Sequence, residues 1–261
     1  SDPKAAITES FRTIRTNLEY LPATDTGRAV LVTSYRPSEG KTFCSVNLSA
    51  ILAKAGKRVL LLELDLHKPK VGVNLGLKNK IGITNILVGK SSIEECIMPT
   101  SIEHFDVILA GASPPNASEL ILSKQLVELF EYGRRHYDYV MVDTPPVGLI
   151  TDALLMMRHV DAALFVINTR FANKDHIRNA VDVFNANPAK TFGFILNGVR
   201  MKKSKYYYNS NYGYGYRYAY GYGGYGGYGY GRTSTGTKSK GKNKGKGKDR
   251  GKQVQEPDNG V

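Results

Sequence analysis

Short, uninterrupted apolar runs recur along the first 200 positions of the chain. They occupy residues 29–33, 59–64, 105–110, 138–143, 162–168 and 192–197. Runs of this kind are typical of strands buried on both faces of a parallel sheet. Between them, apolar residues follow helical spacing at 8–20, 41–55, 117–132, 151–158 and 174–186. Alternating strands and helices predict an α/β fold, with a mostly parallel sheet flanked by helices.

The pattern changes abruptly after about residue 204. Residues 205–231 are rich in glycine and tyrosine, and residues 232–261 are rich in lysine and glycine. Neither segment has enough large aliphatic side chains to build a core, so we expect both to be disordered. The sequence therefore predicts one folded domain, residues 1–204, followed by a tail in two parts.

Most of the positive charge belongs to that tail. The chain has a formal net charge of +13, and residues 1–200 carry 23 Lys and Arg against 20 Asp and Glu, a net of +3. The remaining +10 lies in residues 201–261. A basic tail interleaved with tyrosine is compatible with binding to nucleic acid or an acidic polymer, and equally with plain solvation. The folded part has no such excess, so we do not expect nucleic acid as a partner.

Two absences bear on the compartment. No apolar run approaches the ~18 residues of a membrane span, and no signal peptide is recognisable. Cys44 and Cys96 have neither metal-type nor disulfide-type spacing, which fits a reducing compartment. The chain begins Ser1-Asp2-Pro3 rather than with Met, as expected of the cytoplasmic part of a longer protein.

A phosphate-binding loop is the strongest motif. The sequence Pro-Ser-Glu-Gly-Lys-Thr at 37–42 lies between the first predicted strand and a helix, where backbone N–H groups and the helix dipole favour phosphate. Lys41 is expected to reach the terminal phosphates of ATP, and the Thr42 hydroxyl to bind Mg²⁺. Tyr35 stands where the usual pattern has Gly, although the strand–loop–helix context is intact. The predicted ATP contacts are Pro37, Ser38, Glu39, Gly40, Lys41, Thr42, Phe43 and Asn197.

Acidic residues follow two other predicted strands. Glu63 and Asp65 are two positions apart at the end of one strand, so they point to the same face, and Asp143 ends another. Ligands of open parallel sheets bind at the carboxyl ends of strands. We predict that Thr42 and Asp143 bind Mg²⁺, and that Glu63 and Asp65 face the ligand at this edge of the sheet.

Two more polar residues have two interpretations each. Asn197 ends the last apolar run, where its amide suits either an adenine edge or a turn. Asp152 is either a supporting residue of the site or an acid at a helix start, and we favour the latter. The five histidines show no ligand spacing and are interpreted as structural or exposed.

Several motifs in order resemble one family over about residues 2–231. The chain resembles the cytoplasmic domain of the bacterial tyrosine kinases (BY-kinases) that control export of capsular and exopolysaccharide. The resemblance rests on Glu9-x-x-Arg12-x-x-Arg15, the phosphate loop at 33–42, the second acidic motif at 63–69, the stretches at 82–87 and 115–120, the third motif at 142–153, and the tyrosine cluster.

The resemblance implies a P-loop kinase that transfers the γ-phosphoryl of ATP to its own tail, between subunits of a ring, which this family forms as an octamer. Glu9, Arg12 and Arg15 would pair across subunits. Thr42, Asp65 and Asp143 would bind Mg²⁺, Glu63 would orient or deprotonate the tyrosine, and the implied catalytic residues are Lys41, Glu63, Asp65 and Asp143. Implied partners are a membrane polysaccharide co-polymerase adaptor, fused or separate, at the inner membrane, and a tyrosine phosphatase. The implied phosphoacceptors are Tyr206, Tyr207, Tyr208, Tyr212, Tyr214, Tyr216, Tyr218, Tyr220, Tyr222, Tyr225, Tyr228 and Tyr230.

Three positions set the chain apart from its comparators. The family usually has Asp at position 63 and Arg at position 67, where this chain has Glu63 and His67. The alternative is a switch ATPase of the cell-division or partitioning type, which shares the fold. Those proteins carry a lysine early in the phosphate loop, where this chain has Arg36, and this difference favours the kinase.

Overall fold

A single seven-stranded sheet organises the folded part of the chain. The computed structural model describes residues 6–22, 24–78, 80–186 and 191–199, so the two predicted tail segments lie outside it. The strand order is β3-β4-β2-β5-β1-β6-β7, and all neighbours are parallel except β3 and β4. The strands are β1 (Arg28–Ser34), β2 (Val59–Glu63), β3 (Met98–Pro99), β4 (Phe105–Ile108), β5 (Tyr139–Asp143), β6 (Ala162–Asn168) and β7 (Thr191–Asn197).

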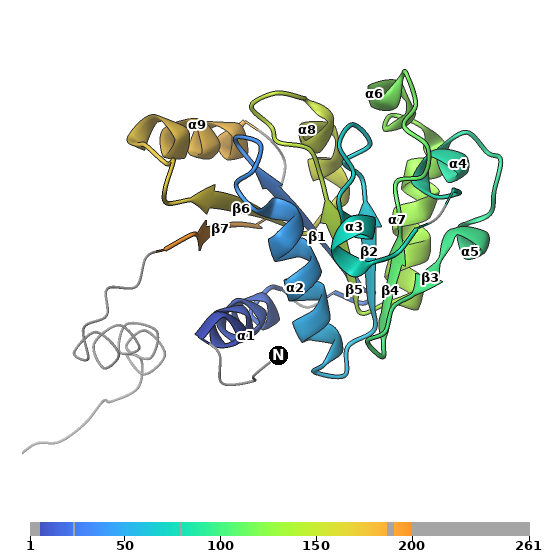
Figure 1. The fold of residues 1–261 in the computed structure, drawn as a ribbon, viewed down its shortest axis with the longest axis horizontal. Coiled ribbons are helices and arrows are strands. Elements are labelled where there is room, and N and C mark those ends of the chain that lie inside the picture. Colours follow the sequence, from blue (N-terminus) through green and yellow to red (C-terminus); the bar gives the residue numbers. More distant parts are fainter. Residues whose placement is uncertain (1–5, 23, 79, 187–190, 200–261) are drawn as a thin grey trace, which may run out of the picture. The chain divides into compact units, whose positions relative to one another are not determined.

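Helices cover both faces of this sheet (Figure 1). One face packs against α1 (Ala6–Glu19), α2 (Lys41–Ala53) and α3 (Val71–Leu75). The other packs against α4 (Ile83–Leu87), α7 (Lys124–His136), α8 (Asp152–Met156) and α9 (Lys174–Asn185). Shorter elements are α5 (Ile93–Cys96), α6 (Ala117–Leu120) and a 3₁₀ turn, η1 (Met157–His159). None of the helices in the described ranges has the length and apolar character that a membrane crossing needs.

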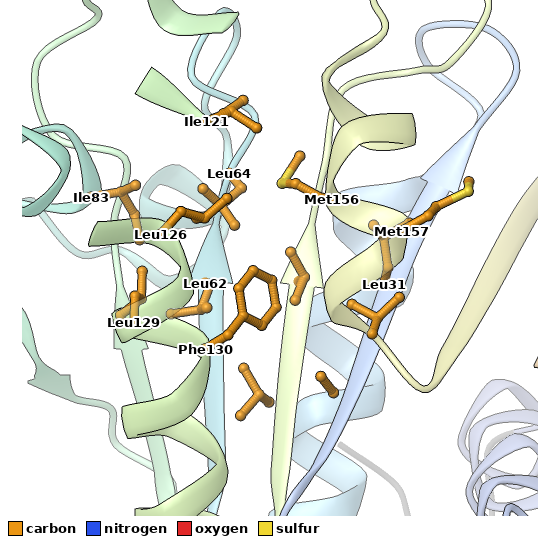
Figure 2. Close-up of a cluster of buried hydrophobic side chains, with 14 of the residues drawn as sticks. Leu31, Leu62, Leu64, Ile83, Ile121, Leu126, Leu129, Phe130, Met156 and Met157 are labelled. Atoms are coloured by element: carbon orange, nitrogen blue, oxygen red, sulfur yellow. The ribbon is translucent and has the colours of Figure 1, made fainter. Parts of the chain in front are cut away.

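The core has two halves because successive strand residues point to opposite faces. Leu62 of β2 packs beneath α7 with Phe130, as Figure 2 shows. Its neighbour Leu61 faces the other way and packs with Leu48 of α2. Each central strand therefore needs apolar side chains on both faces of the sheet, which explains its continuous apolar sequence. The prediction of a mostly parallel α/β sheet is confirmed.

Two predicted helices differ from those observed. The helix expected at 117–132 is divided into α6 and α7, because Ser123 is extended (φ −71°, ψ 155°) and begins a new helix. The helix expected at 151–158 ends as α8 and continues as η1. The short elements α3, α4, α5 and β3 were not predicted individually, since they are too short to show a period.

Candidate active site

The phosphate loop connects β1 to α2 at the carboxyl edge of the sheet. Gly40 precedes α2 with φ 96°, a left-handed conformation that favours glycine. A Cβ at this position would lie 2.2 Å from Asn197 Nδ2, so space also requires glycine. Lys41 and Thr42 form the first turn of α2 and are both buried. The loop thus ends with two polar side chains held inside the protein.

Those two side chains meet acids from other strands. Lys41 Nζ lies 2.7 Å from Asp65 Oδ2 and 4.0 Å from Asp143 Oδ2. Thr42 Oγ1 donates to Asp143 Oδ2 at 2.7 Å, and Ser45 Oγ donates to Asp143 Oδ1 at 3.1 Å. The structure therefore brings Lys41, Thr42, Asp65 and Asp143 together.

Strand order explains this convergence. β5 lies between β1 and β2, so Asp143 at the end of β5 separates the phosphate loop from the acids that follow β2. Leu64 N donates to Asp143 O at 2.8 Å, which keeps the chain leaving β2 against the end of β5. Three segments distant in sequence thus end at one place.

Burial sets the electrostatics of Asp143, which is fully buried. Burial raises the pKa of its carboxyl to about 6, because desolvation disfavours the charged form. Lys41 and the hydroxyls of Thr42 and Ser45 oppose this rise, and Asp65 adds to it. A nearby cation would therefore be strongly favoured here.

The donor set fits Mg²⁺. Thr42 offers a hydroxyl, and Asp65 and Asp143 offer carboxylates, the hard oxygen ligands that Mg²⁺ prefers. In the described part of the chain, no cluster of three or more His, Cys, Asp and Glu side chains could hold a metal. Mg²⁺ is usually held by one or two carboxylates together with substrate phosphates, and Asp65 and Asp143 supply two carboxylates here.

Glu63 lies beside this cluster but has other partners. Its carboxylate is buried and accepts Val71 N at 2.5 Å and Ala110 N at 3.0 Å. Both oxygens are therefore tied to backbone N–H groups, at the base of α3 and just beyond β4. Its assignment as a catalytic residue stays a prediction.

Other predicted ATP contacts brace the loop or lie at its surface. Asn197 Nδ2 donates to Glu39 O at 2.8 Å, so β7 holds the phosphate loop from one side. The Phe43 ring packs edge-on against Phe11 of α1, at 5.9 Å between centroids. Pro37 and Ser38 are exposed. Direct contacts of these residues with nucleotide stay predictions.

Sequence reasoning did not single out Ser45, or the partners of Tyr35 and Asp152. Ser45 lies one turn after Lys41, and this spacing was the available signal. The Tyr35 hydroxyl accepts Asn179 Nδ2 at 3.1 Å, so the residue in the usual Gly position joins the loop to α9. Asp152 is the first residue of α8, as predicted for an acid at a helix start, and it is also fully buried and contacts His67 and Ser118.

The predicted oligomerisation residues share one helix. Glu9 and Arg12 form an ion pair, and Arg15 lies 3.8 Å from Glu19. The helix packs on the domain through Phe11 and Leu18, both buried, and Arg15 lies on that same face by helical spacing. Glu9 and Arg12 are more exposed than Arg15.

Comparison with known proteins decides the family. The AAA domain family matches residues 28–186. Tyrosine-protein kinase YwqD of Bacillus subtilis (strain 168) is 36% identical over 207 residues, which cover 79% of this chain and 87% of that protein. The chain belongs to the bacterial tyrosine-protein kinase family. The solved kinase domain of Escherichia coli tyrosine kinase ETK has a TM-score of 0.74 at 30% identity, covering 78% of this kinase and 80% of that chain.

A cell-division ATPase is a weaker match to this kinase. The septum site-determining protein MinD of Pyrococcus horikoshii OT3, solved with Mg-ADP, has a TM-score of 0.56 at 26% identity. It covers 69% of this chain and 72% of that chain. The fold is shared, so the predicted P-loop NTPase-like class is confirmed, and the closer resemblance is to the kinases.

Proposed function

We propose that this tyrosine kinase transfers the γ-phosphoryl of Mg-ATP to tyrosines in its own tail, residues 205–231. The observation that supports this most is the buried cluster of Lys41, Thr42, Asp65 and Asp143 beside the phosphate loop. Positioning and charge stabilisation are most of what phosphoryl transfer requires. The neighbouring tail supplies the acceptors, Tyr206 to Tyr230.

The transfer exchanges one bond for another. The phenol oxygen of a tyrosine forms a bond to the γ-phosphorus, and the bond to the bridging oxygen of ADP breaks. ADP leaves with that electron pair, and the phenol proton passes to an acceptor, for which Glu63 is our candidate. Lys41 stabilises charge on the phosphoryl oxygens. Thr42, Asp65 and Asp143 would hold Mg²⁺, whose charge would offset that of the phosphates.

The decisive experiment is phosphosite mapping after incubation with γ-labelled ATP. We expect label in tyrosines of residues 205–231, and none in the Lys41→Met variant. Release of free phosphate without protein label would contradict the proposal and support the switch ATPase.

We also propose that transfer occurs between subunits of a ring, in which Glu9, Arg12 and Arg15 form intersubunit pairs. The side chains of these three residues are partly exposed on α1, as a contact with a neighbouring subunit requires. Tail phosphorylation adds nearly two negative charges per tyrosine and would separate the subunits. Equal particle sizes before and after phosphatase treatment would contradict this. A membrane polysaccharide co-polymerase adaptor, with inner-membrane association through it, and a tyrosine phosphatase are the proposed partners.

A further inference from the structure

A buried carboxylate outside the phosphate-binding cluster connects two other segments of the site. Asp152 is the first residue of α8 and is fully buried. Its Oδ1 accepts Ser118 Oγ of α6 at 2.6 Å, and its Oδ2 lies 3.1 Å from His67 Nε2. Both of its carboxylate oxygens are engaged by side chains outside α8, which a position at the start of a helix does not by itself explain.

Burial of this acid calls for a reason. A buried carboxylate is unfavourable unless it is paired, and an apolar residue often replaces such a pair without loss of stability. Its neighbours Ala153 and Met156 are buried apolar residues of the same short helix. The acid is therefore a poor choice for packing alone, and its value lies in the side chains that it holds.

His67 belongs to the loop that carries Asp65. In this loop Lys68 N donates to Asp65 Oδ1 at 3.0 Å, and Ser113 Oγ donates to Leu66 O at 2.9 Å. His67 lies between these two anchors and reaches across to Asp152. The Asp152–His67 contact thus ties the loop of Asp65 to the segment that follows Asp143.

We infer that Asp152 is a positioning residue for phosphoryl transfer, acting through His67 on Asp65. The contact fixes the separation of the two acid-bearing loops, and so the direction of the Asp65 carboxylate relative to Lys41 and Mg²⁺. Ser118 holds Oδ1 of Asp152, which keeps Oδ2 turned toward His67. Residues that orient metal ligands typically change metal affinity or activity by about 10–100-fold when they are removed.

The test uses Asp152→Asn and His67→Ala, with His67→Arg as the conservative variant. We expect Asp152→Asn and His67→Ala each to raise the Mg²⁺ concentration for half-maximal ADP binding by about tenfold. Turnover should show kcat lowered by about tenfold, with little change in KM for ATP. His67→Arg should restore both, because a guanidinium can still donate to Asp152.

Two surface variants serve as matched controls. His136→Ala and Asp175→Asn change the same residue types at exposed positions and should leave Mg²⁺-dependent ADP binding unaltered. If Asp152→Asn fails to fold, the two His67 variants decide alone. Wild-type Mg²⁺ dependence in His67→Ala overturns the inference. Equal loss in His67→Ala and His67→Arg also overturns it, because the imidazole itself would then be required.

The proposed tyrosine phosphorylation and the positioning role of Asp152 can be disproved separately. Only the turnover measurement rests on the proposed function, since Mg²⁺-dependent ADP binding requires no tyrosine acceptor. If no variant or wild-type protein phosphorylates tyrosine while His67→Ala still weakens Mg-ADP binding, the proposed function fails and the positioning role stands.

Discussion

Charged side chains gather both where the parallel strands begin, the amino edge of the sheet, and where they end, the carboxyl edge. Their surroundings differ at the two edges. At the amino edge, a cavity of about 380 Å³ is lined by five basic residues, namely Arg28, Lys57, Arg58, Arg134 and Arg135, with two acids, Asp25 and Asp138. Arg58 and Asp138 pair there with side chains 57% and 37% exposed. At the carboxyl edge, Lys41, Asp65 and Asp143 are 10% exposed or less.

The difference shows that the size of a hollow does not locate the chemistry. Charges at the amino edge satisfy one another and nearby backbone groups, as when Asp161 accepts both Arg134 and Ala29 N. At the carboxyl edge, Asp65 and Asp143 contact one lysine and two hydroxyls, and all of these groups are buried. An incoming cation gains most there, because its charge completes a cluster that solvent does not screen.

The largest predicted contrast comes from removing one cation at each edge. Lys41→Met should lower phosphorylation by at least about 100-fold, because it removes charge stabilisation of the transferring phosphoryl. Arg134→Met removes the partner of Asp161 and should lower the melting temperature while leaving Mg-ADP affinity unchanged. Kinase assays, calorimetric binding and thermal unfolding measure both. Comparable loss of Mg-ADP affinity in Arg134→Met would break the distinction between the edges.

Acidification should separate the edges by pH. The pKa of Asp143 is raised to about 6, so Mg²⁺ affinity should fall by roughly tenfold per pH unit below that value as this ligand is protonated. Because the folded pKa lies above the ordinary 3.8, the same protonation stabilises the metal-free fold as pH falls through 6. Titration of Mg-ADP binding from pH 8 to about 5 tests this, with Asp143→Asn expected to abolish the transition.

The pKa of Asp138 at the amino edge is shifted in the opposite direction from that of Asp143. A hydrogen bond from Arg58 lowers the pKa of this carboxyl below 3.8. Its contribution to stability is therefore present above pH 3.8 and is lost as pH falls through the folded pKa. No change in the Asp138–Arg58 pair is expected between pH 7 and 5, the window in which the carboxyl edge loses Mg²⁺.

A smaller effect is expected from restoring the usual glycine of the phosphate loop. Tyr35→Gly removes the hydrogen bond with Asn179 and the ring contact with His176, at 5.5 Å between centroids. We expect a loss of about 1–2 kcal/mol in the free energy of unfolding, and ADP affinity within about twofold of wild type. Denaturant unfolding and calorimetry measure the two. A large loss of affinity would assign Tyr35 to the nucleotide site.

The smallest effect should come from the exposed pair of the amino edge. Arg58→Ala breaks its ion pair with Asp138, and exposed pairs of this kind contribute little to stability because solvent screens them. Thermal unfolding should shift slightly, less at high salt, and phosphorylation should not change. A marked drop in activity would give the amino-edge cavity a function.

Much of this architecture could be predicted from the sequence. The strand predicted at 162–168 has the same bounds as β6, and β1 begins one residue before the start predicted at residue 29. Convergence of Asp65 and Asp143 on the phosphate loop followed from one rule, that ligands meet the carboxyl ends of parallel strands. Local pattern was enough wherever an element was long and fully buried.

What could not be predicted depends on partners distant in sequence. Glu63 and Asp65 share a face, yet Glu63 is taken by the backbone of Val71 and Ala110 while Asp65 reaches Lys41. Nothing in the spacing of the two acids distinguishes them. The pairing of Asp152 with His67 spans 85 positions, and strand order alone does not specify it.

The hydrogen bond from Asn197 to the phosphate loop places the end of β7 beside the candidate active site. The chain runs on from that strand end to the proposed acceptors, the first nine positions later and the last 33 positions later. At about 3.4 Å per residue, the distance from Asn197 can be no more than ~30 Å for Tyr206 and ~110 Å for Tyr230. Acceptors confined to such a radius reach local concentrations on the order of millimolar. Dilution of the protein would then weaken association between separate copies while leaving the concentration of tethered tyrosines around each site unchanged.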